Sequence, residues 1–279
     1  MSEQVRRLTT GDLASGEMRA LMRETAVDAV GFYRKPGFQV ASAPEDPRRP
    51  GAARYPRPMS SARQTEWETR YAAADRLWSG APNDWLSLAA DWEPGRSLDV
   101  GCGEGADVLW LAEHGWRVTG VDFAPTAIAR MLTEARRRGL AERVRGTVLD
   151  LSADPLPEGP FDLVTSFYVH GGPEPGSLDL PRLLVRLAGL VADGGRLLTA
   201  AHCTNPPWHG HHARTYRPEQ LADAVLGAAA GTWEVEASEE RWREAVSPEG
   251  VPGRRSDAVV CLRRSMVRGT GGRSAGGTG

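Results

Sequence analysis

The sequence predicts an α/β fold: a mostly parallel sheet of seven strands with helices on both faces and one antiparallel strand near the edge. Short apolar runs alternate with stretches of helical periodicity between residues 97 and 264. Repeated strand–helix units of this kind imply parallel strands that are covered on both faces. The last two runs, 232–240 and 256–264, have no helix between them, so one of them is expected to run antiparallel.

The expected strands are bounded by glycines or by polar turns. "SLDVG" ends in glycine, "RVTGVD" is rich in β-branched residues, and "TWEVEASEE" alternates as a half-buried strand does. The turn Asp193-Gly194-Gly195 is expected to open the fifth strand. The seven predicted strands are 97–101, 117–122, 144–150, 161–168, 194–202, 232–240 and 256–264.

The expected helices fall between these strands, which gives a Rossmann-like order. The segment 104–114 has apolar residues at positions 108, 109, 111 and 112, a helical spacing. Gly139 is expected to end the second helix, and Pro218 stands near the start of the last. The four predicted helices are 104–114, 124–139, 178–192 and 217–227.

Composition limits the class of protein. Of 279 residues, 41% are hydrophobic, which is enough for a full core. The net charge of −2 and a pI near 6.3 give no basic face, so no nucleic-acid partner is expected. No apolar run approaches the ~18 residues that span a bilayer, and the N-terminus lacks the apolar segment of a signal peptide. The expected protein is soluble, without a membrane partner.

The three cysteines, Cys102, Cys203 and Cys261, fit neither a disulfide framework nor a zinc ribbon. They favour a reducing, cytoplasmic setting. Composition also divides the chain. We expect an accessory or remnant segment over 1–40, a proline-rich linker over 41–60, the main domain over 61–264 and a disordered, glycine-rich tail over 265–279.

A glycine-rich turn, "DVGCGEG" at 99–105, follows the first predicted strand. Ligands of open parallel sheets bind beyond the carboxyl ends of the strands. Gly101 and Gly103 carry no side chains, so a ligand can lie against the backbone there. Asp122 ends the next strand and can accept hydrogen bonds from a ribose, while Asp150 ends the third and can accept one from an adenine amine. The pattern indicates a nucleoside site.

Two further carboxylates, Asp99 and Glu104, flank this turn. They fit poorly with a pyrophosphate at the helix N-terminus, where dinucleotides place one. They fit well with a cationic ligand that also carries an ammonium group. S-adenosylmethionine (SAM), an adenosyl sulfonium with an amino acid end, has this chemistry.

At these residues the sequence resembles the class I SAM-dependent methyltransferases. "LDVGCGEG" is close to their first motif, "GVD" to the second and "VLD" to the adenine-contacting one, and the likeness covers roughly residues 65–264. The resemblance implies methyl transfer with SAM as cofactor. The cofactor contacts it implies are Asp99, Gly101, Cys102, Gly103, Asp122, Phe123, Asp150, Leu151 and Phe167.

The upstream segment "WETRYAAADRLWSGAPNDWL" is similar to the helix that precedes the first strand in the tellurite-resistance and thiopurine methyltransferase branch. That likeness implies that Trp67, Arg70, Tyr71 and Trp78 line the SAM pocket. An aromatic face attracts a sulfonium by up to about 2 kcal/mol when desolvated. The alternative is that these aromatics form ordinary amphipathic-helix core.

The fourth strand ends in "SFYVHGG", which faces the substrate in the resembled family. His170 is therefore a candidate general base, since its reference pKa is near 6.5. A structural histidine that caps the loop is the alternative. Tyr168 is expected to contact the substrate.

A second histidine group, "AHCTNPPWHGHHARTY", follows the fifth strand. Its histidines and Cys203 raise the possibility of zinc or iron. Prolines interrupt the spacing, however, and no HExxH or CxxC pattern occurs, so a substrate loop without metal is expected. Within it we take His202 as a second candidate catalytic residue, and Trp208 and His209 as acceptor contacts.

The N-terminal piece faintly resembles two separated ends of a GNAT acetyltransferase, through "VRRLTTGDLASGEMRALMRET" and "AVGFYRKPGFQVASAP". The acetyl-CoA loop of that family is missing. No acetyl transfer is expected, and the piece is interpreted as a cap over the active-site mouth or over a dimer partner.

The expected reaction is in-line methyl transfer from SAM to a small-molecule thiol, phenol or amine. Two alternatives stay open: a non-catalytic protein that binds SAM or its product S-adenosylhomocysteine (SAH), and a nicotinamide oxidoreductase. The second is disfavoured by the motif spacing and by the single lysine, Lys35, which leaves no Tyr-x-x-x-Lys pair. The acceptor, the need for a base and the choice between monomer and homodimer are not decided by the sequence.

Overall fold

The computed structural model describes residues 62–169, 171, 177–208, 214–247 and 249–266, and the backbone of Arg6–Arg7 and Phe38–Gln39. The chain divides into two compact units, Met1–Ser79 with Ala124–Ala127, and Gly80–Phe123 with Ile128–Gly279. The predicted accessory segment, linker and tail lie outside the described residues, apart from the two short pairs and the start of the tail. Those interpretations stay predictions.

In the first unit, β1 (Arg6–Arg7) pairs in parallel with β2 (Phe38–Gln39). The helix α3 (Ala62–Ala72) buries Tyr71 in a small apolar cluster with Ala124 and Ala127. The Glu68 carboxylate accepts a hydrogen bond from the backbone N–H of Thr126, at 3.2 Å, and another from its hydroxyl. These contacts hold α3 to the four residues of 124–127.

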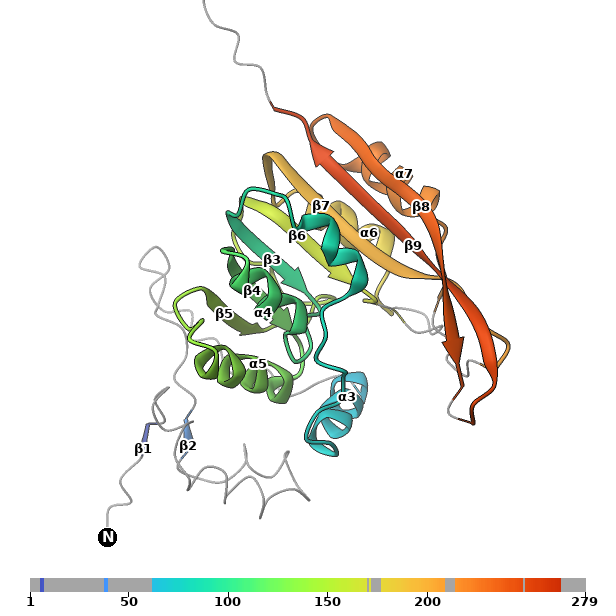
Figure 1. The fold of residues 1–279 in the computed structure, drawn as a ribbon. Coiled ribbons are helices and arrows are strands. Elements are labelled where there is room, and N and C mark those ends of the chain that lie inside the picture. Colours follow the sequence, from blue (N-terminus) through green and yellow to red (C-terminus); the bar gives the residue numbers. More distant parts are fainter. Residues whose placement is uncertain are drawn as a thin grey trace, which may run out of the picture. The chain divides into compact units, whose positions relative to one another are not determined.

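The second unit contains one seven-stranded sheet in the order β5-β4-β3-β6-β7-β9-β8 (Figure 1). All neighbouring pairs are parallel except those made by β9, which runs antiparallel to both β7 and β8. The predicted fold class is therefore confirmed. The strands are β3 (Arg96–Val100), β4 (Arg117–Asp122), β5 (Val144–Val148), β6 (Phe161–Phe167), β7 (Val191–Thr204), β8 (Trp233–Val246) and β9 (Pro252–Arg264).

Helices cover both faces of this sheet. The helices are the 3₁₀ helix η2 (Asp84–Ala89), α4 (Ala106–Glu113), α5 (Pro125–Arg137), α6 (Leu180–Ala188) and α7 (Pro218–Ala228). One buried cluster joins η2, α4 and residues 128–135 of α5 to one face, and a second joins α6 and α7 to the other. Alternate residues of one strand enter opposite clusters, as Leu163 and Val164 of β6 do, which is the two-face burial expected of a parallel sheet.

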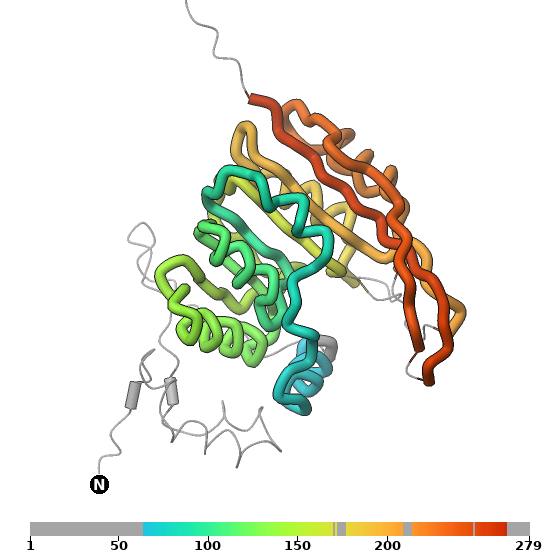
Figure 2. Tube along the Cα trace, viewed as in Figure 1, coloured from blue at the N-terminus to red at the C-terminus, as the bar shows by residue number. Residues whose placement is uncertain are grey.

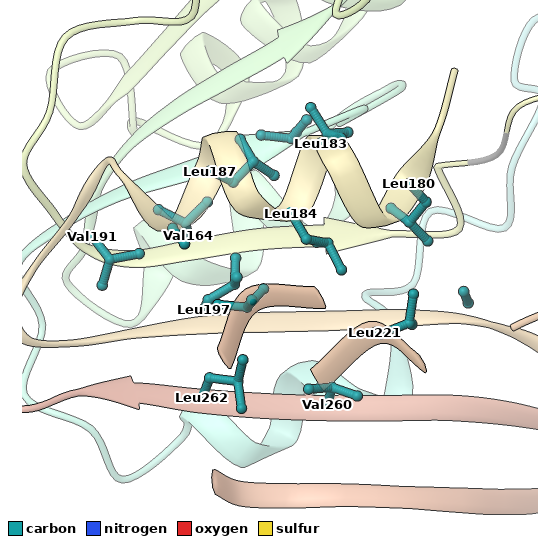
Figure 3. Packing of buried hydrophobic residues seen from close by; sticks show 14 of the residues in the cluster. Val164, Leu180, Leu183, Leu184, Leu187, Val191, Leu197, Leu221, Val260 and Leu262 are labelled. Atoms are coloured by element: carbon teal, nitrogen blue, oxygen red, sulfur yellow. The ribbon is translucent and has the colours of Figure 1, made fainter. Parts of the chain in front are cut away.

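The packing of α6 shows how the sequence specifies this layer. Leu180, Leu183, Leu184 and Leu187 repeat at helical spacing and are all buried against the sheet (Figure 3). The Asp179 side chain accepts a hydrogen bond from the backbone N–H at the third helical position and so caps the helix. The helix is shorter than the predicted 178–192 because of this cap and because β7 begins soon after it.

The strand β7 begins before the Asp193-Gly194-Gly195 turn that was expected to open it. Its pairing with β6 shifts register between Phe161 and Leu163, so the glycines form a bulge inside the strand. Gly194 has φ of 79°, which only glycine adopts at little cost. The turn signal was correct, but the bulge lets the ladder continue on both sides of it.

The hairpin of β8 and β9 is longer than predicted. The strand β9 pairs with β7 as far as Ser256, opposite Thr204, and then continues with β8 alone to the pair Val246 and Pro252. Figure 2 shows the two strands running side by side to this tip. The hairpin therefore extends past the carboxyl end of β7, where ligands of parallel sheets bind.

Candidate active site at the carboxyl edge of the sheet

The glycine-rich turn folds tightly over the end of β4. The backbone N–H groups of Gly101 and Cys102 both donate to the carbonyl of Val121, at 2.8 and 3.0 Å. Gly101 and Gly103 have φ of 72° and 51°, in the left-handed region that favours glycine. The predicted reason for Gly101 was room for a ligand, but a Cβ there would stand 2.5 Å from a methyl group of Val169. Close packing of the loop after β6 therefore also requires this glycine.

Gly105 begins α4 as its N-cap, with φ of 81°. A Cβ at this position would stand 2.2 Å from the Cγ of Met131 on α5, so the glycine allows α4 to pack closely on that helix.

Gly105→Ala is expected to destabilise the fold by about 2–4 kcal/mol, from the left-handed backbone and from overlap with Met131. Gly139→Ala is the matched control, because Gly139 has φ of 73° but open space around its missing Cβ. It should cost only about 1–2 kcal/mol. Urea unfolding of both variants measures the difference, and equal losses would show that Met131 is not the constraint.

Buried carboxylates surround the turn. Asp122 accepts a hydrogen bond from the Gly103 N–H at 3.0 Å. Asp99 accepts one from the Thr165 hydroxyl at 2.6 Å. Asp107, in the first turn of α4, accepts from both the backbone and the side-chain N–H of Asn83, each at 2.6 Å. Asp99 and Asp122, both predicted from the sequence, therefore lie at one turn.

The electrostatics of this group favour a cation. Burial, and next the charge of Asp107, raise the pKa of Asp99 to about 8, although the Thr165 hydroxyl opposes the shift. The second oxygen of Asp99, Oδ2, is buried and has no hydrogen-bond partner among the described residues. Burial also raises the pKa of Asp107, against the hydrogen bonds from Asn83. A cationic group at Asp99 would satisfy Oδ2 and restore the charge of the carboxylate, so these residues fit the predicted SAM.

The other predicted cofactor residues lie around the same edge. Phe123 directly follows β4, and Asp150 and Leu151 lie beyond β5, which ends at Val148. The Asp150 carboxylate accepts hydrogen bonds from the N–H and hydroxyl of Ser152.

The side chains of Cys102 and Phe167 belong to the protein interior. Phe167 is buried in the cluster beneath α4, and Cys102 packs against that cluster with its Sγ 3.8 Å from the Sδ of Met131. Burial raises the pKa of the Cys102 thiol well above its usual value. The backbone of these two residues is the part that remains for a cofactor contact.

The predicted aromatic residues cluster within the first unit. The ring of Trp67 lies 6.1 Å from that of Tyr71 and 6.0 Å from that of Trp78, centroid to centroid. The Trp78 Nε1 donates to the Tyr71 hydroxyl at 3.1 Å. The guanidinium of Arg70 already lies 4.2 Å from the Trp67 ring centroid. Contact of this cluster with a cofactor stays a prediction.

A second polar group lies at the carboxyl ends of β6 and β7. His202 of β7 faces Asp257 of β9, its register partner, with Nδ1 3.1 Å from Oδ1. Arg243 of β8 donates from Nε to the other oxygen of Asp257 at 2.7 Å. A carboxylate only accepts hydrogen bonds, so Nδ1 must donate, and the Nε2 of neutral His202 keeps its lone pair. The pair has the form of a base held by a carboxylate.

Asp257 stays ionised although it is fully buried. Burial alone would raise its pKa, but hydrogen bonds from His202, Arg243 and Tyr168 outweigh this and lower the pKa below its ordinary value. A charged carboxylate in this position also stabilises an imidazolium that forms during proton transfer.

Tyr168, predicted as a substrate contact, lies beside this pair. Its backbone has φ of 54°, unusual for a side chain of this size. Its hydroxyl donates to Asp257 at 2.8 Å and accepts from the Trp85 Nε1 at 3.1 Å, and its ring lies 4.8 Å from that of His202. Burial, and next the charge of Asp257, raise the pKa of Tyr168, so the phenol stays protonated and donates. Tyr168 therefore positions the pair.

Trp208 packs on the hairpin, where a Cβ on Gly253 would stand 2.9 Å from its Nε1. The predicted residues His170 and His209 lie outside the described residues.

Within the described ranges no group of three histidine, cysteine or acidic side chains is arranged to hold a metal ion. The same part of the chain has no helix with the length and apolar character needed to cross a membrane.

Sequence reasoning missed Asp257, Arg243 and Trp85. Asp257 had a usable signal, since it is the one charged residue in the apolar run "SDAVVCL". A buried charge that interrupts such a run needs partners. No local sequence signal marked Arg243 or Trp85, because their positions in the site depend on contacts between segments that are distant in the sequence.

The turn and the polar group share one edge of the sheet. The strands β3, β4, β6 and β7 are parallel, so their carboxyl ends lie on the same side. Val169, next to Tyr168, also touches the turn at Gly101. A cofactor at the turn and an acceptor at His202 would thus lie at the ends of β3 and β7, with β6 between them.

Comparisons with known proteins find similarity to methyltransferases. Residues 98–195 match the family described as "Methyltransferase domain". The chain is 43% identical over 54 residues to ribosomal RNA small subunit methyltransferase C of Alcanivorax borkumensis, covering 19% of this chain and 17% of that protein. It is 30% identical over 126 residues to the ubiquinone biosynthesis O-methyltransferase of Pseudomonas aeruginosa, covering 44% and 51%. The chain thus spans about half or less of the length of these relatives.

The fold is similar to that of TehB from Haemophilus influenzae, with a TM-score of 0.54 and 20% identity over 65% of this chain and 62% of that one. This likeness concerns the fold alone, so the tellurite-resistance branch stays a prediction. The matched segment contains the glycine-rich turn, Asp122 and Asp150. The turn, the sheet order and the family match support a methyltransferase domain of the class I type around residues 98–195, a class whose cofactor is SAM.

Proposed function

We propose that this chain transfers a methyl group from SAM to a hydroxyl group of a small molecule, with His202 as the general base. The observation that carries the proposal is the His202–Asp257 pair at the edge that also holds the glycine-rich turn. When bound, SAM supplies a methyl group already activated on a sulfonium. The acceptor oxygen would bond to that methyl carbon as the carbon–sulfur bond breaks with its electron pair on sulfur, and Nε2 of His202 would take the hydroxyl proton.

The buried carboxylates would bind the cofactor. Asp99 would hold the ammonium group, because its Oδ2 is buried without a partner among the described residues. Asp122 would accept a hydrogen bond from the ribose while it still accepts the one from the Gly103 N–H. Asp150 would meet the adenine amine, and the backbone from Gly101 to Gly103 would lie along the ligand. Trp67, Tyr71 and Trp78 remain proposed aromatic contacts.

The presence of a carboxylate-held base favours a hydroxyl acceptor over a thiol. A thiol has a reference pKa near 8.5 and is partly ionised at neutral pH, whereas a phenol near 10 needs its proton removed. The O-methyltransferase among the relatives is consistent with this choice. The ribosomal RNA relative raises another acceptor, but a net charge of −2 offers little attraction for RNA phosphates.

Asp122→Ala is expected to weaken the binding of SAM about ten-fold or more, because the substitution removes one or two charge-assisted hydrogen bonds of about 1.5–3 kcal/mol each. Calorimetric titrations with SAM, SAH and NAD measure the affinity for each and identify the cofactor.

SAH release, measured for phenols, thiols, amines and ribosomal RNA in turn, identifies the class of acceptor that is methylated. Asp162→Asn, at the amino end of β6, is the control and should behave as wild type. Unchanged SAM affinity in Asp122→Ala, or SAH release with thiols or RNA alone, would contradict the proposal; binding without release would favour the non-catalytic alternative.

A further inference from the structure

Three arginines lie at the amino ends of three neighbouring strands, at the edge of the sheet opposite the glycine-rich turn. Arg96 begins β3, Arg117 begins β4, and the two are register partners. Arg143 directly precedes β5, and its carbonyl accepts a hydrogen bond from the backbone N–H of Val118 at 2.8 Å, which places it beside Arg117. Neighbouring strands lie about 4.8 Å apart, so three like charges in this arrangement repel one another. An anion between them would offset the repulsion.

The three arginines line one cavity with a volume of about 350 Å³. Gly95 and Gly115 also line it and have no side chains that could fill it. The Pro94 ring and Asp162 complete the lining. A volume of this size is in the range of small-molecule sites. Because β3, β4 and β5 are parallel, their amino ends and this cavity lie at the edge opposite the proposed active site.

The guanidinium groups around the cavity have neutral partners. Arg143 donates from Nη1 to the carbonyl of Gly115 at 2.6 Å, and the guanidinium of Arg96 lies 4.9 Å from the Phe161 ring centroid. In the part of the chain that the structure describes, neither these two arginines nor Arg117 forms an ion pair. A carbonyl oxygen or a ring face orients a guanidinium group but does not cancel its charge.

Asp162 is the one acidic residue among the described residues that line this cavity. Its Oδ2 accepts a hydrogen bond from the backbone N–H of Arg96 at 2.8 Å, so the carboxylate is turned to the strand backbone. Glu93 and Glu142 lie next to lining residues in the sequence, but neither lines the cavity. The lining therefore has two positive charges in excess. The net charge of −2 predicted no basic face, but the sheet brings together arginines from segments that are distant in the sequence.

We propose that this cavity binds a dianionic phosphate group, either on a small phosphorylated molecule or as free phosphate. Two excess positive charges match a phosphate monoester, which carries about −1.5 to −2 charges at pH 7. Guanidinium groups bind phosphate oxygens through charge-assisted hydrogen bonds, often in pairs. The cavity and the proposed active site lie at opposite edges of the sheet, so this binding goes beyond the proposed function and does not depend on it.

The arrangement of the arginines favours phosphate over other anions. Guanidinium groups from three strands can each meet a different oxygen of one tetrahedral group, whereas a carboxylate has two oxygens in a plane. A nucleic acid is a long polyanion, and a chain with a net charge of −2 offers it little attraction outside this cavity. The volume and the charge of the cavity together favour a small ligand.

The test is a calorimetric titration of the full chain with inorganic phosphate, glycerol 3-phosphate and malonate, at constant ionic strength and at pH 8, where phosphate monoesters are dianionic. At least one of the two phosphates should bind with a Kd at or below about 1 mM, and more tightly than malonate. Tighter binding of glycerol 3-phosphate supports a phosphorylated molecule as the ligand, and tighter binding of inorganic phosphate supports the free ion. Weaker binding of both phosphates, equal or tighter binding of malonate, or tighter binding of a single-stranded RNA overturns the inference.

Arg117→Gln is expected to weaken phosphate binding about ten-fold or more, because it removes a charge-assisted hydrogen bond. Arg143→Gln should have a similar effect, and Arg117→Lys, which keeps the charge, should lose less. Arg145→Gln is the matched control, because Arg145 lies on β5 two residues after Arg143 but does not line the cavity. An equal loss in Arg145→Gln would indicate a general attraction to this edge and overturn the inference.

Measurements with SAM separate this site from the proposed active site. Arg117→Gln should keep the wild-type SAM affinity and melting temperature, which confirms that the variant is folded. Saturating SAM should leave phosphate binding unchanged, whereas competition between the two would place the phosphate at the active site and overturn the inference. Absence of SAH release with every acceptor would contradict the proposed function and leave this inference intact. Absence of phosphate binding would overturn this inference alone.

Discussion

Asp257→Asn is expected to lower kcat for methyl transfer by about 10²–10⁴-fold, the usual contribution of a general base, and to leave SAM affinity unchanged. The asparagine amide can donate to Nδ1 of His202, which would move the ring proton to Nε2 and remove the lone pair that accepts the acceptor's proton. It would also leave Arg243 without its anion. Steady-state kinetics with a phenol acceptor and calorimetry with SAM measure the two effects.

The control for this prediction is the companion variant His202→Gln. If Asp257 acts through His202, the double variant Asp257→Asn/His202→Gln should be no slower than His202→Gln alone. A purely structural role would instead lower the melting temperature and make the losses of the two single variants add in the double variant. Wild-type kcat in either single variant would exclude the pair as the base.

Local signals in the sequence were sufficient for the sheet and the glycine-rich turn. The short apolar run of β6 is typical of a strand buried on both faces, and the leucines of α6 repeat at helical spacing, so these local patterns predict both elements. Asp99 is the last residue but one of β3 and Asp122 the last of β4, and the common direction of these parallel strands brings the two carboxylates to one edge.

The polar group at His202 was not predictable in the same way. It depends on the register between β7 and β9, which sets His202 against Asp257 across 55 residues of sequence. Tyr168 was identified, but its role follows from a left-handed backbone that turns the hydroxyl onto Asp257. Arg243 comes from β8, which pairs with β9 along the whole hairpin, and no local pattern marks that pairing.

Asp99→Asn is expected to raise the free energy of unfolding of the protein without cofactor and to lower its affinity for SAM. Asp99 has a pKa of about 8 in the folded chain, against an ordinary value of 3.8. Between these values the folded state holds a proton that the unfolded state has lost, so stability falls as pH rises from about 4 to 8. Asparagine removes this cost, and urea unfolding at pH 7.5 should show a gain on the order of a few kcal/mol. A loss of stability at that pH would contradict the assignment of a neutral, buried acid.

The same acid predicts a pH dependence of cofactor binding. If the ammonium of SAM requires the ionised form of Asp99, only the ionised fraction of the protein binds, and that fraction grows roughly ten-fold per pH unit below a pKa of 8. SAM affinity should therefore rise roughly ten-fold between pH 6 and 7, where the cofactor's own amino group stays protonated, and binding should release a proton. Asp99→Asn should bind weakly with no slope, and Asp162→Asn should keep the wild-type slope. Calorimetry in buffers of different ionisation enthalpy measures the number of protons released on binding. If the SAM affinity of wild type does not change with pH, Asp99 does not ionise when SAM binds.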